Sequence, residues 1–140
     1  MRSLITLLML LVCTSTPAKE LDFSNVPYWY KAKLVRVIDG DSYVLDVDLG
    51  LGVHKEEKCR LLGVDTPEIF GVKKDSKGYE RGMAAKRYVQ KVLDLQSEYF
   101  WIRTHWDRRG KYGRLLVDVY VVIMGKEYEL QKLLITNDFE

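Results

Sequence analysis

Three short strand-type segments, each followed by a turn sequence, most constrain how this chain can fold. They span residues 30–38, 42–47 and 53–64 and are rich in β-branched and aromatic side chains, which favour strands. Asp39-Gly40 lies between the first two segments, and Leu49–Gly52 lies between the second and the third. Three consecutive strands joined by short turns form an antiparallel meander, so the sequence predicts a sheet in this region.

The hydrophobic period changes after this region. Apolar side chains within residues 80–95 recur every three or four positions, which predicts an amphipathic helix. Its apolar face consists of Ala84, Ala85, Tyr88, Val89, Val92 and Leu93. Two further strands are predicted over residues 99–105 and 115–123, and a short helix over residues 128–135. Segregated strands and helices indicate an α+β fold, which we expect to be a five-stranded OB-type Greek-key β-barrel.

The N-terminal residues have the three-part pattern of a secretory signal peptide. Arg2 supplies a positive charge, residues 3–12 form an apolar run rich in leucine, and residues 14–18 are small or polar. A bilayer-spanning helix needs about 20 apolar residues, so this run favours a cleaved signal over the alternative, a retained membrane anchor. We therefore predict a signal peptide over residues 1–18 and a secreted or periplasmic mature protein with no membrane contact.

The mature chain is expected to hold a flexible lead-in over residues 19–29 and one folded domain over residues 30–140. Removing 18 of 140 residues leaves 122, a length that suits a single core. Of 22 basic residues, Arg2 leaves with the signal, so 21 remain against 20 acidic residues. A protein that coats nucleic acid is usually more basic than this, so any phosphate binding must be local.

Cysteine usage excludes a disulfide framework and a paired-cysteine metal site. Cys13 belongs to the predicted signal peptide, so the mature chain has no second cysteine with which Cys59 could form a disulfide. Cys59 precedes Arg60 on a strand, so its side chain is predicted to point into the core as a small hydrophobic group. The alternative, a nucleophilic cysteine, would need a neighbouring base, and nothing in the sequence supplies one.

Three charged turns follow or precede the predicted strands. Taken singly, Asp39–Asp41, Asp65–Glu68 and Lys111–Arg114 are ordinary turn sequences. Taken together they indicate one site, because neighbouring antiparallel strands bring the start of one strand beside the end of the next. We therefore expect Asp41 and Asp65 to lie side by side, with an arginine approaching from the start of the fifth strand.

These groups match the requirements of phosphodiester hydrolysis. Two carboxylates beside the backbone carbonyl of Thr66 form a set of hard oxygen ligands, suited to Ca²⁺ or Mg²⁺ and better to Ca²⁺ where the geometry is loose. Guanidinium groups bind phosphate oxygens in pairs, which assigns that task to Arg60 and Arg114. Glu68 has no basic sequence neighbour and is the candidate general base.

The three motifs in this order resemble the staphylococcal nuclease (thermonuclease) family. They are Val37–Ser42, Arg60–Glu68 and Lys111–Arg114, and the resemblance covers most of the mature chain, from about Lys33 to the final helix. It implies an OB-type barrel in a secreted, Ca²⁺-dependent nuclease that cleaves DNA and RNA to 3′-phosphorylated products. Among the site residues, it implies that Asp41, Asp65 and the carbonyl of Thr66 bind the metal, with Asp39 in support.

The resemblance also assigns roles in catalysis. Arg60 and Arg114 would clamp the phosphate, and Glu68 would take a proton from the attacking water or orient it. Tyr112, together with Tyr79 or Tyr43, could stack on a base or cover a terminal phosphate. For each tyrosine, the alternative is packing in or around the core.

The sequence departs from the family pattern in three places. Ser42 stands where the family usually has threonine, and the hairpin over residues 49–57 is longer than in the archetype. The family generally continues into a further C-terminal helix, which is missing from a chain that stops at Glu140. We therefore expect part of the barrel to be exposed, marginally stable or closed by a partner subunit, an oligomeric state that the sequence leaves open.

A second class of function shares the same fold. A nuclease-fold module can bind nucleic acid or a protein without cutting, as related repeats of Tudor-nuclease proteins do. Loss of the metal and arginine positions would indicate such a module, and all of these positions are present here. The near-neutral charge also argues against a stoichiometric nucleic-acid binder, so the sequence favours the enzyme.

Overall fold

The computed structural model describes residues 28–139, apart from the side chains of residues 106–109. The predicted signal peptide, residues 1–18, and most of the predicted lead-in therefore lie outside the described residues. The last two residues of that lead-in, Tyr28 and Trp29, belong to the first strand instead. They pair with Thr104 and Arg103 of a distant strand, and sequence-local patterns cannot reveal such a partner.

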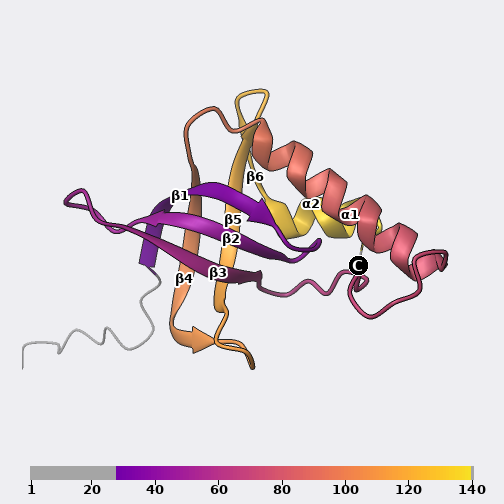
Figure 1. Cartoon of the computed structure of the whole chain (residues 1–140). Helices are drawn as coiled ribbons and strands as arrows, with labels where there is room; N and C mark the ends of the chain where they lie inside the picture. Colours follow the sequence, from indigo (N-terminus) through magenta and orange to yellow (C-terminus); the bar gives the residue numbers. More distant parts are fainter. Residues whose placement is uncertain (1–27, 140) are drawn as a thin grey trace, which may run out of the picture.

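Six strands and two helices make up the described structure (Figure 1). In chain order they are β1 (Tyr28–Val37), β2 (Ser42–Asp48), β3 (His54–Leu61), α1 (Lys77–Asp94), β4 (Phe100–Arg109), β5 (Leu115–Ile123), β6 (Lys126–Glu129) and α2 (Leu130–Thr136). Neither helix in this part of the chain has the length and apolar character that crossing a membrane requires.

The first five strands form a closed barrel, which confirms the predicted α+β fold of the OB type. The sheet runs β3-β2-β1-β4-β5, and pairing between β3 and β5 closes it. The closing pair is parallel and short, with Cys59 opposite Leu115 and Leu61 opposite Val117. Where β3 and β5 pair, the sheet has no free edge, so the backbone hydrogen bonds of both strands are satisfied internally there.

A short sixth strand was not predicted. β6 pairs with the end of β5, Tyr120 lying opposite Glu129, and α2 begins only at Leu130. The sequence had placed Tyr128 and Glu129 in the helix. Their pairing with β5 overrides the local helical pattern, which is the usual way that tertiary contacts displace an element boundary.

The barrel interior holds the core, and both helices lie on the same side of the barrel (Figure 1). Cys59 is fully buried among the core residues, as predicted. The side chains that are completely buried and largest include Tyr43, Leu45, Leu61, Ile102, Leu130 and Leu134. Burial of each such aliphatic side chain contributes about 1.5–3 kcal/mol, so the barrel and α2 form one cooperative unit.

Helix α1 begins three residues earlier than its apolar period predicted. Ser76 caps it, because the Ser76 hydroxyl accepts a hydrogen bond from the Tyr79 backbone N–H at 3.2 Å. The buried residues of the helix include Ala85, Val89, Val92 and Leu93 from the predicted face, and also Gly82, which the apolar pattern did not mark.

Gly82 allows α1 to pack against the loop that follows β3. A Cβ atom at this position would lie 2.5 Å from the Pro67 carbonyl oxygen and 2.6 Å from Ile69 Cγ2. Gly78, in the first turn of the same helix, has no such neighbour within 4 Å. The two glycines thus separate the effect of close packing from the intrinsic cost of glycine in a helix.

We predict opposite effects for alanine at the two positions. Gly82→Ala should lower the free energy of unfolding by about 1–3 kcal/mol, because the added methyl group overpacks the contact with the Pro67 carbonyl. Gly78→Ala should raise it by up to about 1 kcal/mol through helix propensity. Chemical denaturation of both variants measures the difference, and equal stabilisation of both would contradict a tight contact at Gly82.

Candidate active site

Arg60 joins two carboxylates at the end of the β2–β3 hairpin. Arg60 lies opposite Ser42 in the antiparallel register, next to the turn that carries Asp41. Its Nη1 donates to Asp41 Oδ1 at 3.1 Å, and its Nη2 lies 3.1 Å from Asp41 Oδ2 and 2.5 Å from Asp65 Oδ1. The expected proximity of Asp41 and Asp65 is therefore present, with a guanidinium group between them.

Asp41 is the most perturbed carboxylate of this cluster. Only 3% of the residue is exposed. Burial raises the pKa of its carboxyl to about 6, the nearby Asp39 adds to the rise, and the Ser42 hydroxyl and Arg60 act in the opposite direction. Asp65, by contrast, has a side chain that is 82% exposed. One buried and one exposed carboxylate thus share the same arginine.

Ser42 links Arg114 to the same carboxylate. Arg114 Nη1 donates to Ser42 Oγ at 2.8 Å, and Ser42 Oγ donates to Asp41 Oδ1 at 2.8 Å. Arg114 lies just before β5, whose first residues pair with β3, so barrel closure brings it to the hairpin. The sequence identified Arg114 but treated Ser42 only as a mild departure, although a hydroxyl next to Asp41 was the available signal.

Thr66 approaches the turn at Gly40 closely. Its backbone N–H donates to Asp41 Oδ2 at 3.2 Å, and a Cβ atom at Gly40 would lie only 2.6 Å from Thr66 Oγ1. Thr66 Oγ1 is buried and has no hydrogen-bond partner among the described residues. Glycine at position 40 therefore lets the two motifs meet, and an unpaired oxygen remains beside them.

The oxygen donors of this cluster fit a hard divalent cation. Asp41 and Asp65 already direct oxygens at one cationic nitrogen. Burial, the largest cause, and the neighbouring Asp39 raise the pKa of Asp41, so a bound cation would favour the charged form of this carboxyl. Within the described residues there is no group of three or more His, Cys, Asp or Glu side chains that could hold a metal. An ion bound here would therefore need backbone oxygen and water to complete its shell, as Ca²⁺ readily accepts.

The remaining predicted residues lie around the cluster rather than within it. Glu68 is exposed in the same loop and forms no hydrogen bond or ion pair with a described residue. Tyr112 is 75% exposed, and the Lys111 ammonium and the Arg114 guanidinium lie 5.8 and 5.7 Å from its ring centroid. Asp39 is buried, and its Oδ1 accepts a long hydrogen bond of 3.3 Å from the Asp41 N–H.

Tyr43 is a core residue and cannot stack on a ligand. It is fully buried, its hydroxyl donates to the Gly40 carbonyl oxygen at 2.6 Å, and burial raises the pKa of its hydroxyl well above the ordinary value. The packing alternative is thus correct for this tyrosine. Tyr79 is partly buried in the first turn of α1.

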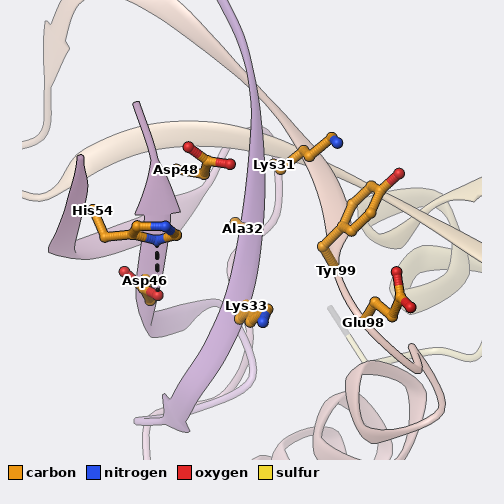
Figure 2. A pocket seen from close by; sticks show the side chains of 8 residues that line it. All are labelled: Lys31, Ala32, Lys33, Asp46, Asp48, His54, Glu98 and Tyr99. Carbon is orange, nitrogen blue, oxygen red and sulfur yellow. Dashed lines mark ion pairs between the residues drawn. The ribbon is translucent and has the colours of Figure 1, made fainter. Parts of the chain in front are cut away.

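A separate hollow of about 370 Å³ lies at the opposite end of the β2–β3 hairpin (Figure 2). There His54 Nδ1 lies 3.2 Å from Asp46 Oδ2, the only ion pair drawn among the lining residues. Asp48 and His54 are paired at the far end of the strands, whereas Ser42 and Arg60 are paired at the near end. This hollow is therefore distinct from the Arg60 cluster.

Comparison with known proteins places the chain in a family. The family described as "Staphylococcal nuclease homologue" matches residues 58–138, which include the end of β3, both helices and the Arg114 turn. The fold and the carboxylate–arginine cluster agree with this match. The chain therefore belongs to the staphylococcal nuclease homologue family.

Two relatives are named thermonucleases. The thermonuclease of Staphylococcus intermedius is 39% identical over 88 residues, which cover 61% of this chain and 46% of that protein. The thermonuclease of Staphylococcus hyicus is 34% identical over 121 residues, which cover 85% of this chain and 63% of that protein. The chain thus spans less than two thirds of the length of each relative, 46% of the first and 63% of the second.

The environment of Asp41 predicts a pH dependence of stability. The pKa of this carboxyl is about 6 in the folded protein against 3.8 as the reference value. As the pH rises through this interval, the unfolded chain releases the proton first, so this group lowers the stability of the folded state. In cation-free buffer, the free energy of unfolding of the wild type is compared with that of Asp41→Asn. The wild-type value minus the variant value should decrease from pH 4 to pH 6. Denaturation across this range measures the difference, and a constant difference would contradict the raised pKa.

Proposed function

We propose that this protein is a secreted, Ca²⁺-dependent nuclease that hydrolyses DNA and RNA with low sequence specificity and leaves 3′-phosphorylated products. One observation carries the proposal: Arg60 and Arg114 are both held on the buried Asp41 carboxylate, one directly and one through Ser42. Family membership and similarity to two thermonucleases support the same reaction class.

Asp41, Asp65 and the backbone carbonyl of Thr66 would hold the ion. The support for this assignment is that both carboxylates converge on Arg60 and that burial raises the pKa of Asp41, so that a cation would favour its charged form. When bound, Ca²⁺ supplies Lewis acidity at a phosphate oxygen. Asp39 would help to keep Asp41 in place through the Asp41 backbone N–H.

Arg60 and Arg114 would hold the scissile phosphate. Each presents a planar fork of N–H donors that matches two phosphate oxygens, and both remain charged at any physiological pH. They reach the site from β3 and from the turn before β5, so a phosphate could be held between them. Charge that grows on the equatorial oxygens in the transition state would be stabilised by donors already in position.

Glu68 would act as the general base. Its carboxylate is exposed in the loop that carries Asp65, and it is not engaged by any described basic group. A free carboxylate can accept a proton from water that attacks opposite the leaving 5′ oxygen. Tyr112, exposed beside the Arg114 guanidinium, would stack on a base or cover a phosphate.

The proposed substrate range follows from what these residues can contact. All of them address phosphate or a metal ion, and none is placed to read base edges, so specificity should be low. We further propose that residues 1–18 direct export and that residues 30–140 form the nuclease domain. The alternative function, a module that binds nucleic acid or protein without cutting, is an outcome of the first test below.

Calcium should switch on cleavage of single-stranded DNA. The mature protein, incubated with Ca²⁺, should degrade a labelled oligonucleotide, and EDTA should abolish degradation, because Asp41 and Asp65 alone cannot supply Lewis acidity. Gel analysis of the products, including their 3′ ends, measures this. Normal DNA binding without cleavage in Ca²⁺ would establish the binding module instead.

Glu68→Gln should separate binding from turnover. The amide keeps the shape of the side chain but cannot accept the proton, so kcat should fall about 10²- to 10⁴-fold while Ca²⁺ and nucleotide affinity stay unchanged. Glu56→Gln, at an exposed β3 position near the far end of the hairpin, is the matched control and should be fully active. Full activity of Glu68→Gln would remove Glu68 from the mechanism.

A further inference from the structure

The outer surface of β1, β4 and β5 carries an aromatic platform, defined as Trp29, Trp101, Tyr120, Lys31 and Arg103. In the antiparallel register Trp29 lies opposite Arg103 and Lys31 lies opposite Trp101, so aromatic and cationic side chains alternate on two neighbouring strands. Tyr120 lies opposite Trp101 on the third strand. Trp29 and Trp101, each the second residue of its strand, are 48% and 40% exposed, whereas tryptophan is on average highly buried.

The cations of the platform lie over the rings. Arg103 Cζ is 5.7 Å from the Trp29 ring centroid and 5.6 Å from that of Tyr120, within the range of cation–π attraction. Lys31 Nζ is 5.8 Å from the Trp101 ring centroid and 4.5 Å from that of Tyr99. Figure 2 shows Lys31 and Tyr99 beside each other. Lys31 forms no ion pair with a described residue.

A buried carboxylate keeps the platform rigid. Asp118 is 4% exposed, and its Oδ2 accepts from Arg103 Nε at 2.8 Å and lies 2.6 Å from Arg103 Nη2. The other oxygen of Asp118 accepts from Gln131 Nε2 at 2.9 Å. Arg103 is therefore held by Asp118, its opposite residue on the neighbouring strand β5. Arg103 in turn contacts Trp29 and Tyr120, whose ring centroids are 4.9 Å apart.

Two hollows flank the rings at the centre of the platform. One, of about 370 Å³, is lined by Trp29, Trp101, Tyr120 and Glu127. The other, of about 390 Å³, is also bordered by Trp101 and Tyr120, and includes Tyr99 and Val122. Glu127 places negative charge on the β6 side. On the β1 side Lys31 and Lys33 supply positive charge, and Asp46, Asp48 and Glu98 line the neighbouring hollow with them.

We propose that this platform binds unpaired bases of single-stranded nucleic acid, at a distance from the Arg60 cluster. Alternating aromatic and cationic side chains are the pattern by which proteins bind single strands, since rings stack on bases and cations meet phosphates. The inference rests on the proposed function for its substrate class, and it adds a second contact that holds the strand without taking part in cleavage.

Binding measured without cleavage tests the proposal. A labelled thymidine oligomer of about 12 nucleotides, within the site sizes of single-strand-binding folds, is titrated with mature protein in EDTA and followed by fluorescence anisotropy. Trp101→Ala should weaken binding about tenfold, and Trp101→Phe, which keeps a ring, should bind within a few-fold of wild type. Tyr128→Ala is the matched control, because Tyr128 on β6 is similarly exposed, at 38%, but lies outside the platform.

Two further variants make the outcome decisive. Lys31→Glu reverses an exposed charge without disturbing the core and should also weaken binding about tenfold, with a reduced salt dependence. Lys77→Glu reverses an exposed charge in the first turn of α1, outside both the platform and the Arg60 cluster, and should leave this binding intact. Unchanged affinity in both Trp101→Ala and Lys31→Glu, or the same loss in Lys77→Glu as in Lys31→Glu, would overturn the proposal.

Self-association gives a different result in the same experiment. If the platform joins two copies of the chain, sedimentation will show a dimer that Trp101→Ala dissociates while its affinity for the oligomer stays the same, and the proposal is then wrong. The nuclease assay remains separate: lack of cleavage with intact platform binding would reject only the proposed function. Cleavage with unaltered binding by the platform variants would reject only the platform.

Discussion

The pairing of Arg60 with Asp41 is the interaction on which the site depends. Asp41 is almost completely buried, and a buried carboxylate without a partner is strongly destabilising. Arg60 reaches it across the β2–β3 pair and also contacts Asp65, so one guanidinium group joins two strands and the loop after β3. Removing one partner of a buried pair usually costs about 3–5 kcal/mol, because the other charge is left uncompensated. Burial raises the pKa of Asp41, so a cation bound at this cluster would favour the charged form of the carboxyl.

Close packing at Gly40 gives this electrostatic arrangement its geometry. The turn approaches both Thr66 and Ala85 so closely that a methyl group would not fit. Tyr43, buried below, holds the turn through the Gly40 carbonyl oxygen. Gly82 likewise allows a close approach, in this case between α1 and the Pro67 carbonyl oxygen. The helix, the turn and the loop are thus packed into a single unit, and the charged groups extend from its surface toward solvent.

The barrel separates two surfaces with different chemistry. At the near end of the β2–β3 hairpin, arginines and carboxylates gather around the buried Asp41. On the outer face of β1, β4 and β5, aromatic rings alternate with Lys31 and Arg103, and Asp118 holds the arginine from the neighbouring strand. Both surfaces use a buried aspartate to position an arginine. The first leaves hard oxygens accessible, whereas the second leaves aromatic rings accessible, so the two suit different parts of a nucleic acid.

The sequence by itself determined the first five strands, the helix α1, the burial of Cys59 and the meeting of Asp41 with Asp65 and Arg60. These follow from local alternation, turn chemistry and the register of neighbouring strands, all of which act over short distances along the chain. Only the tertiary structure decided the parallel closure of β3 on β5, the short strand β6, the link through Ser42 and the aromatic platform. Each of these joins residues that are remote in sequence, and cross-strand pairing leaves no periodic signal in either partner alone. The roles of Glu68 and Tyr112 stay predictions, since neither residue is held by the cluster and a ligand would have to engage them.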